Sequence, residues 1–288
     1  MTTLFLDHAN GRIAYDMTGT GPLVICVPSM GDVRGEYRFL APRLAQAGYR
    51  VVTMDVRGHG ESSTAWDDFS VAGIGSDIVA LIRHLNAGPA VIVGDSMAAG
   101  ATVWAAAEAP ELMAGAILVG PFVRSEPSLF TNLLFGAMFS RPWGPAMWQW
   151  YYKMLYPTQK PADFAEYVHN LRKNLAERGR MEALQKMLAA SKSASEQRLG
   201  QVKAPALVLM GTKDPDFKDP EAEARWVAEK INAQLHMIEG AGHYPHAEMP
   251  GAVAPLVLAF LAQHAAPAVA EPKSTPANEW VKELAYGA

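Results

Sequence analysis

The sequence predicts an α/β fold, with a mostly parallel twisted sheet, helices on both faces and a helical insertion. Segments with helical periodicity alternate with short apolar runs, as in successive βαβ units. Near-continuous apolar runs are typical of strands covered on both faces of a parallel sheet. They occupy residues 23–28, 50–56, 90–95, 115–122 and 206–212. The alternation stops after Phe122, which indicates an insertion.

The remaining elements follow in order along the chain. Two alternating segments at residues 3–8 and 12–19 flank Ala9-Asn10-Gly11, and Asn-Gly between such segments predicts a hairpin. Helical periodicity covers residues 35–48, 71–88, 96–110, 219–232 and 247–263, with a last strand at 233–240. Gly48 and Gly88 lie where the first two of these helices should end.

Residues 123–201 contain no convincing strand and are expected to form a helical cap. Their first part is rich in Trp, Met, Phe and Tyr, and its apolar face should rest over the carboxyl ends of the strands, where ligands bind. The core would then comprise residues 1–122 and 202–265. Residues 266–288 would form a linker and a short tail, with Asn278 as a candidate helix N-cap.

Composition narrows the class of protein. The net charge of -4, from 29 acidic and 25 basic residues, argues against a nucleic-acid-binding protein. The single cysteine, Cys26, lies in an apolar run and is expected to be a small buried residue. Neither a basic leader nor an apolar stretch of membrane-spanning length is seen, so we expect a soluble cytoplasmic protein. A homo-oligomer stays open.

The segment "VIVGDSMAAG", residues 91–100, places Ser96 between a buried strand and a helix. Gly94 and Ala98 are small enough to permit a sharp turn there. The hydroxyl would project beside a helix N-terminus, whose free N–H groups favour negative charge. Serine is also a common helix cap. This segment alone therefore leaves both a cap and a nucleophile open.

Four segments in succession resemble motifs of the α/β-hydrolase superfamily, and the resemblance covers nearly all of residues 3–265. They are the oxyanion loop with the following helix, strand and turn, the nucleophile elbow, the strand end that carries the acid, and the histidine loop. They read "VPSMGDVRGEYRFLAPRLAQAGYRVVTMDVRGHGESS", "VGDSMAAG", "VLMGTKDPD" and "IEGAGHYPHAEMP". Their chain order, Ser then Asp then His, is the one that this fold uses.

The resemblance implies a catalytic role for three residues. Ser96 would be the nucleophile, and His243 would take its proton and return it to the leaving group. Asp214 fits the position of the orienting acid, and Asp216 is the competitor. Asp219 is better explained as a helix cap.

The resemblance also implies an oxyanion hole made of two backbone N–H groups, those of Met97 and Met30. The loop Pro28–Gly31 departs from the His-Gly pair usual in the family, but backbone donors need no particular side chain. The predicted substrate pocket is apolar and comprises Ser29, Trp143, Met147 and Trp148.

Other polar residues near these motifs have simpler explanations. Asp95 would flank the nucleophile without facing the substrate, and His59 would be structural. Arg34 and Glu36 are expected at the solvated surface, although Arg34 could contact a polar substrate group. His246 forms an H-x-x-H pair with His243, but the sequence offers no third metal ligand nearby. His84 and His169 fall on helical patterns as surface or packing residues.

We therefore expect a serine hydrolase that cleaves carboxylic esters of apolar small molecules through an acyl-enzyme, with no cofactor or metal. Lactone hydrolysis, carbon–carbon bond hydrolysis, cofactor-free perhydrolysis and acyl transfer could use the same residues. A non-catalytic small-molecule receptor is the alternative of another class. An Asp-nucleophile dehalogenase or epoxide hydrolase is disfavoured by Ser96 at the elbow.

Overall fold

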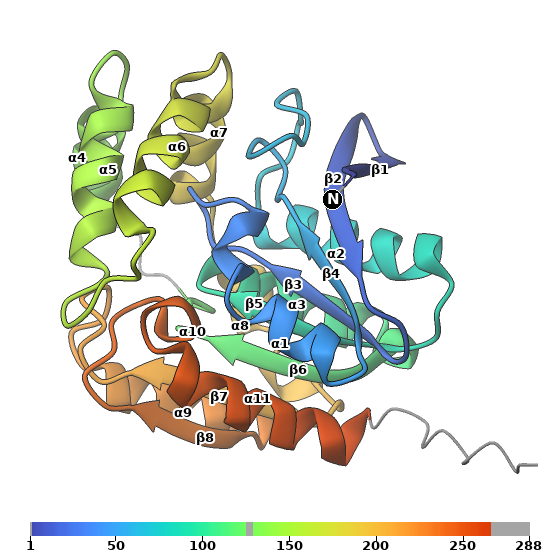
Figure 1. Cartoon of the computed structure of the whole chain (residues 1–288). Helices are drawn as coiled ribbons and strands as arrows, with labels where there is room; N and C mark the ends of the chain where they lie inside the picture. The colour runs from blue at the N-terminus through green and yellow to red at the C-terminus, as the bar shows by residue number, and fades with distance from the viewer. Residues whose placement is uncertain (1, 125–128, 266–288) are drawn as a thin grey trace, which may run out of the picture.

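The computed structural model describes residues 2–124 and 129–265. Asn278 and the predicted tail lie outside the described residues. One eight-stranded sheet organises the chain, in the order β1-β2-β4-β3-β5-β6-β7-β8 (Figure 1). The strands are β1 Leu4–His8, β2 Gly11–Thr18, β3 Leu23–Val27, β4 Arg50–Met54, β5 Ala90–Asp95, β6 Met113–Val119, β7 Ala206–Gly211 and β8 Gln234–Ile238.

The pairing confirms the predicted mostly parallel sheet. β1 and β2 form the antiparallel hairpin around Ala9-Asn10, and β2 also pairs antiparallel with β4. All pairs from β4 through β3, β5, β6 and β7 to β8 are parallel. The parallel strands consequently end at one edge of the sheet, where the predicted functional motifs begin.

Helices cover both faces of the sheet. The helical elements are η1 Arg34–Tyr37, α1 Ala41–Gln46, α2 Val71–Leu85, α3 Met97–Glu108, η2 Pro110–Leu112, α4 Leu129–Met138, α5 Gly144–Met154, α6 Phe164–Ala176, α7 Arg180–Ala189, α8 Ser193–Glu196, η3 Leu199–Gln201, α9 Pro220–Ile231, α10 Pro245–Glu248 and α11 Pro250–His264. Along β6 and β7, alternate side chains point to opposite faces: Leu118 and Val208 pack toward α3 and α9, whereas Ile117 and Leu207 pack toward α11.

Two helix predictions need correction. The helix expected over residues 35–48 is split into η1 and α1, because Pro42 fits only the first turn of a helix. The second correction concerns α2, which ends before Gly88. Asn86 adopts the left-handed conformation at its C-cap, with φ 44°. Asparagine tolerates this conformation better than most residues, so it replaces the expected glycine.

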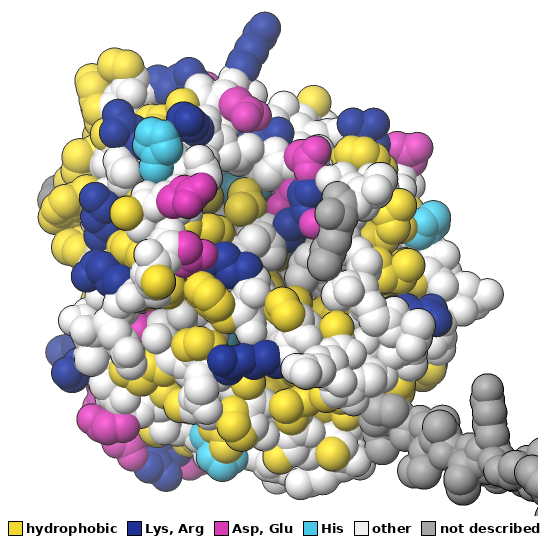
Figure 2. Space-filling model, in the orientation of Figure 1, with side chains coloured by type: hydrophobic (Ala, Val, Ile, Leu, Met, Phe, Trp, Pro, Cys, Tyr) yellow, Lys and Arg dark blue, Asp and Glu magenta, His cyan; other side chains and the backbone are white. Residues whose placement is uncertain are grey.

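Helices α4 to α7 follow β6 in the chain and stand together beyond one end of the sheet (Figure 1). The aromatic residues of this segment form a core of their own, in which Trp148, Tyr152 and Phe164 pack with Tyr244 of the histidine loop. Trp143, by contrast, is 54% exposed. Exposed apolar side chains of this segment gather at the left edge of the molecule in Figure 2, and they include Leu133, Leu134, Trp143, Trp150 and Met154.

None of the helices in the described ranges combines the length and the apolarity needed to span a bilayer. Cys26 is free and buried, as predicted.

Candidate active site

Ser96 lies in the sharp turn between β5 and α3. Its φ of 54° and ψ of -118° are strained for a residue with a side chain. Neighbouring backbone contacts stabilise this conformation, since the Ser96 N–H donates to Val119 O over 2.8 Å. A Cβ atom on Gly94 would lie 2.5 Å from Ala98 O and from Thr102 Oγ1, so only glycine fits there. The predicted tight turn is therefore present.

His243 follows β8, and its Nδ1 lies 2.7 Å from Asp214 Oδ2. Asp214 follows β7, and both side chains are almost completely buried. The His243 N–H donates to Leu155 O over 3.0 Å, which ties the histidine loop to the chain after α5. The Asp214 carboxylate therefore positions the ring at Nδ1, and the backbone hydrogen bond to Leu155 positions the loop that carries it.

Ser96 and His243 line one small cavity of about 40 Å³. Within the described ranges no hydrogen bond joins the Ser96 hydroxyl to the imidazole, so what the two residues share is the cavity wall. Apolar and aromatic side chains form most of the wall. The lining residues are Ser29, Met30, Ser96, Phe135, Phe139, Trp148, Tyr151, Leu155, Leu188, Asp216, His243 and Tyr244.

Two of the four residues predicted for the substrate pocket, Ser29 and Trp148, line this cavity. Trp143 and Met147 are not among the described lining residues. Trp143 points outward at 54% exposure, with its indole N–H bonded to Ala137 O. Met147 packs at the edge of the aromatic core of the helical segment. The richness of the segment in aromatic residues could not tell which of them face the cavity.

Asp216 occupies a different position from Asp214. Its Oδ2 lies 3.6 Å from His243 Nε2, on the cavity side of the ring, and its Oδ1 accepts a hydrogen bond from the Tyr151 hydroxyl. Burial alone would lower the pKa of His243, but the charges of Asp214 and Asp216 outweigh it and raise that pKa well above its usual value. Burial raises the pKa of Asp216.

Most backbone donors of the loop after β3 are already engaged. Ser29 N–H donates to Glu36 Oε2 over 2.9 Å, and Gly31 N–H donates to His59 Nε2 over 3.1 Å. The structural role expected for His59 is therefore support of this loop. Among the described residues, the Met30 N–H has no acceptor. The Met97 N–H, at the first position of α3, has none either. These two groups are the pair that the resemblance implied.

Hydrogen bonds from side chains also fix the loop after β3. Ser29 Oγ lies 2.7 Å from the Tyr244 hydroxyl, and the Trp148 indole N–H donates to Gly31 O over 2.9 Å. The loop is therefore bonded both to the histidine loop and to the helical segment.

A second cluster of ionisable side chains lies behind the cavity and was missed by sequence reasoning. Glu36, Asp95 and His246 are fully buried, and one ligand-type atom from each lies within 4.8 Å of the others. His246 Nε2 is 3.1 Å from Glu36 Oε1, whereas neither Asp95 oxygen has a hydrogen-bond partner among the described residues. The expectation that Glu36 is solvated is wrong. The three residues come from separate segments, so no local signal could have grouped them.

Desolvation dominates the ionisation of this second cluster. Burial raises the pKa of Glu36 to about 8 and raises that of Asp95 well above its usual value. Burial also lowers the pKa of His246 to about 3. Burial thus favours the neutral form of all three side chains. The donor types of this cluster, and those of Asp214, Asp216 and His243, are also ones that metal ions bind.

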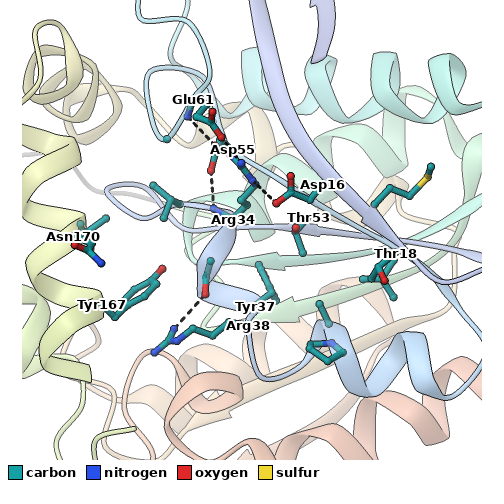
Figure 3. A pocket seen from close by; sticks show the side chains of 18 of the residues that line it. Asp16, Thr18, Arg34, Tyr37, Arg38, Thr53, Asp55, Glu61, Tyr167 and Asn170 are labelled. Carbon is teal, nitrogen blue, oxygen red and sulfur yellow. Dashed lines mark hydrogen bonds and ion pairs between the residues drawn. The ribbon is translucent and has the colours of Figure 1, made fainter. Parts of the chain in front are cut away.

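A larger hollow of about 720 Å³ lies elsewhere, bordered by β2, β4, η1, α1 and α6 (Figure 3). Arg34 points there toward Asp16, Asp55 and Glu61 and forms ion pairs with all three. Its side chain is only 16% exposed, so the expectation of a solvated Arg34 is also wrong. Ser96 is not among the described residues that border this hollow. His84 and His169, by contrast, are exposed as expected.

The profile of the family described as alpha/beta hydrolase fold matches residues 22–250. The chain belongs to this family. It is 28% identical over 270 residues to a 2-hydroxy-6-oxononadienedioate/2-hydroxy-6-oxononatrienedioate hydrolase of Burkholderia vietnamiensis, covering 88% of this chain and 92% of that one. It is also 36% identical over 109 residues to a Mycobacterium tuberculosis protein that carries the name non-heme bromoperoxidase BpoC. That alignment spans 38% of this chain and 41% of the relative.

Among solved structures, a bromoperoxidase from Bacillus anthracis superposes with a TM-score of 0.79 at 21% identity, covering 90% of this chain and 99% of that chain. At this identity the likeness shows the fold alone. Membership of the hydrolase family supports the conclusion that the protein is an enzyme. The relatives are named for different reactions.

Proposed function

We propose that this α/β-hydrolase is a serine hydrolase that cleaves carboxylic esters of small molecules through an acyl-enzyme, without a cofactor. The observation that carries the proposal is the convergence on one cavity of a strained Ser96 and a His243 ring held at 2.7 Å by Asp214. The two uncommitted N–H groups of Met30 and Met97 support it, because acyl transfer needs donors where an oxyanion forms.

The reaction would proceed in two halves. Ser96 Oγ attacks the ester carbonyl while its proton passes to His243 Nε2, and the oxyanion accepts hydrogen bonds from Met30 and Met97. His243 then gives the proton to the departing alkoxide, and the C–O bond breaks to leave an acyl-serine. A water molecule attacks that ester with the same proton transfers, which releases the carboxylic acid and restores Ser96.

Asp214 would orient the ring and stabilise the imidazolium, because it bonds the nitrogen that is not used in proton transfer. Asp95 is fully buried and lies outside the described cavity lining, which argues against it as an alternative nucleophile.

The lining favours neutral or apolar substrates over anionic ones. The described lining contains one carboxylic side chain, Asp216, and no Lys or Arg. The Burkholderia relative is named for dioate substrates, which carry two carboxylates, and Asp216 would repel such groups. We therefore propose ester hydrolysis ahead of carbon–carbon bond hydrolysis of dioates. Helices α4, α5 and α7 contribute wall residues, so residues 123–201 would act as a cap that closes the cavity.

The decisive experiment compares Ser96→Ala with the unmodified protein on short p-nitrophenyl esters. Ser96→Ala should reduce kcat on the order of 10⁴-fold or more, because the nucleophile is lost. It should also lose covalent labelling by a fluorophosphonate. Ser193→Ala, at an exposed serine of α8, is the matched control and should leave both unchanged. Retained turnover in Ser96→Ala would remove the nucleophile assignment, and binding without any turnover by the unmodified protein would favour a receptor.

A further inference from the structure

Asp216 places an acidic group inside the cavity that the proposed mechanism does not use. Its side chain is 19% exposed, and Oδ1 is bonded by the Tyr151 hydroxyl. Oδ2 faces His243 Nε2 across 3.6 Å, which is longer than a hydrogen bond. Among the described residues, no Lys or Arg nitrogen lies within ion-pairing distance of this carboxylate. One oxygen is thus left free toward the cavity.

Aromatic rings line the same cavity as this carboxylate, and one of them, Tyr151, is bonded to it. Five of the lining residues are aromatic, namely Phe135, Phe139, Trp148, Tyr151 and Tyr244. Trp148 contacts Phe139 with ring centroids 5.2 Å apart and Tyr151 at 5.5 Å, so the rings form a continuous wall. Aromatic faces attract cations, and an adjacent carboxylate adds a full opposite charge. This combination of groups fits an ammonium ion better than a neutral alkyl group.

Resting on the proposed ester hydrolysis, we propose that Asp216 selects substrates that carry a positively charged ammonium group, which it binds through Oδ2 against the aromatic wall. The group would lie within a few ångströms of His243 Nε2, and hence near the ester bond that Ser96 attacks.

The charges around His243 supply a reason for such a preference. Asp214 and Asp216 raise the pKa of His243, which favours the imidazolium, and an imidazolium cannot accept the Ser96 proton. A substrate cation beside Asp216 provides that positive charge instead. His243 can then be neutral when it must act as the base. The cation therefore contributes both to binding and to readiness of the base.

The test uses two esters of nearly identical shape, 2-(trimethylammonio)ethyl butyrate and the neutral 3,3-dimethylbutyl butyrate. The unmodified full-length protein should show kcat/KM at least about tenfold higher for the cation, given typical cation–π and ion-pair strengths. Asp216→Asn should bring the ratio of the two kcat/KM values to about one. Because both substrates depend on the same base and nucleophile, the ratio cancels any general effect of the substitution on His243.

Two further variants separate charge from folding. Tyr151→Phe keeps the carboxylate and the aromatic ring but removes the hydrogen bond that favours the charged form of Asp216, so it should keep a preference for the cation that is smaller than in the unmodified protein. Glu196→Gln removes an exposed charge outside the described cavity lining and should also keep it. A ratio that Asp216→Asn leaves within twofold, or a wild-type preference for the neutral ester, overturns the proposal.

A binding measurement distinguishes this failure from failure of the ester chemistry. Calorimetric titration of Ser96→Ala with choline and with 3,3-dimethylbutanol requires no turnover. Tighter binding of choline that Asp216→Asn abolishes would support the cation site even if neither ester is cleaved. Equal binding of both alcohols would refute it.

Discussion

His243 and His246 lie three residues apart, and each ring has two carboxylates beside it, but their surroundings shift their ionisation in opposite directions. The pKa of His243 is raised by Asp214 and Asp216 against the effect of burial. Burial dominates at His246 and lowers its pKa to about 3, despite Glu36 at 3.1 Å. The same residue types therefore favour a protonated ring in one place and a neutral ring in the other.

The difference lies in what else bonds each carboxylate. Asp214 receives the His243 ring at 2.7 Å and the Asp216 N–H at 3.0 Å, donors that stabilise a charge. Asp95 has no donor among the described residues, and Glu36 has a backbone donor on one oxygen only. Burial favours the protonated form of a carboxylate that has few donors, and that form does less to raise the pKa of a neighbouring imidazole. Hydrogen-bond donors to the carboxylates, rather than the number of nearby acids, decide which histidine has a raised pKa.

The largest expected effect tests whether Asp214 holds the base. Asp214→Asn should reduce kcat for ester hydrolysis by about 10³- to 10⁴-fold, because an amide favours the wrong tautomer of the ring. Steady-state kinetics on a p-nitrophenyl ester measures this. Asp219→Asn is the matched control: Asp219 only caps α9 by accepting from Ala222 N–H at 2.9 Å, and asparagine caps equally well. A smaller loss in Asp214→Asn than in Asp216→Asn would reverse the assigned roles.

The fold and the Asp214–His243 pair were within reach of the sequence. Apolar runs located the strands because parallel strands are buried on both faces, and motif order identified Ser96, Asp214 and His243 as candidates. The choice between Asp214 and Asp216 as the partner of His243 could not be made from the sequence. They are two residues apart in a loop, and only three-dimensional geometry places one at Nδ1 and the other near Nε2.

The second cluster, Glu36, Asp95 and His246, could not be predicted from the sequence for another reason. The charged residues around Glu36 are typical of a solvent-exposed segment. The sequence around Asp95 and around His246 does not indicate that either residue lies near Glu36. Burial of Glu36 results from packing of η1 against the histidine loop, a long-range contact. For Trp143 the opposite error arose, because an aromatic residue in a short helical segment gave no sign of which way it would point.

A second prediction contrasts the two histidines directly. The His246 ring is fully buried and stacks on Tyr37, with centroids 4.8 Å apart. His246→Ala should leave a cavity and lower the free energy of unfolding by about 2–4 kcal/mol. It should change kcat of the folded protein by less than about tenfold. His243→Ala should abolish turnover, and it should also lower stability because it leaves the buried Asp214 carboxylate without its ion-pair partner. Urea denaturation and active-site-normalised kinetics measure both, and loss of turnover in a fully folded His246→Ala would end the contrast.

The smallest expected effect concerns the pH dependence of stability contributed by Glu36. Its pKa rises from the usual 4.5 to about 8 because the side chain is buried. Between these values the folded state holds a proton that the unfolded state has lost. The Glu36 contribution is therefore fully present below about pH 4.5 and is lost as the pH rises through about 8. The part of the stability that depends on Glu36 should fall over this range.

Glu36→Gln keeps an oxygen that can accept the Ser29 N–H but cannot ionise. At pH 5 it should match the unmodified protein within about 1 kcal/mol, the usual net value of one hydrogen bond. As the pH approaches 8, the variant should become the more stable of the two, because it carries no charge to bury. Urea denaturation at pH 5, 6.5 and 8 measures the difference. Curves that run parallel at all three values would mean that Glu36 is ionised in the folded protein. The buried cluster would then carry a charge.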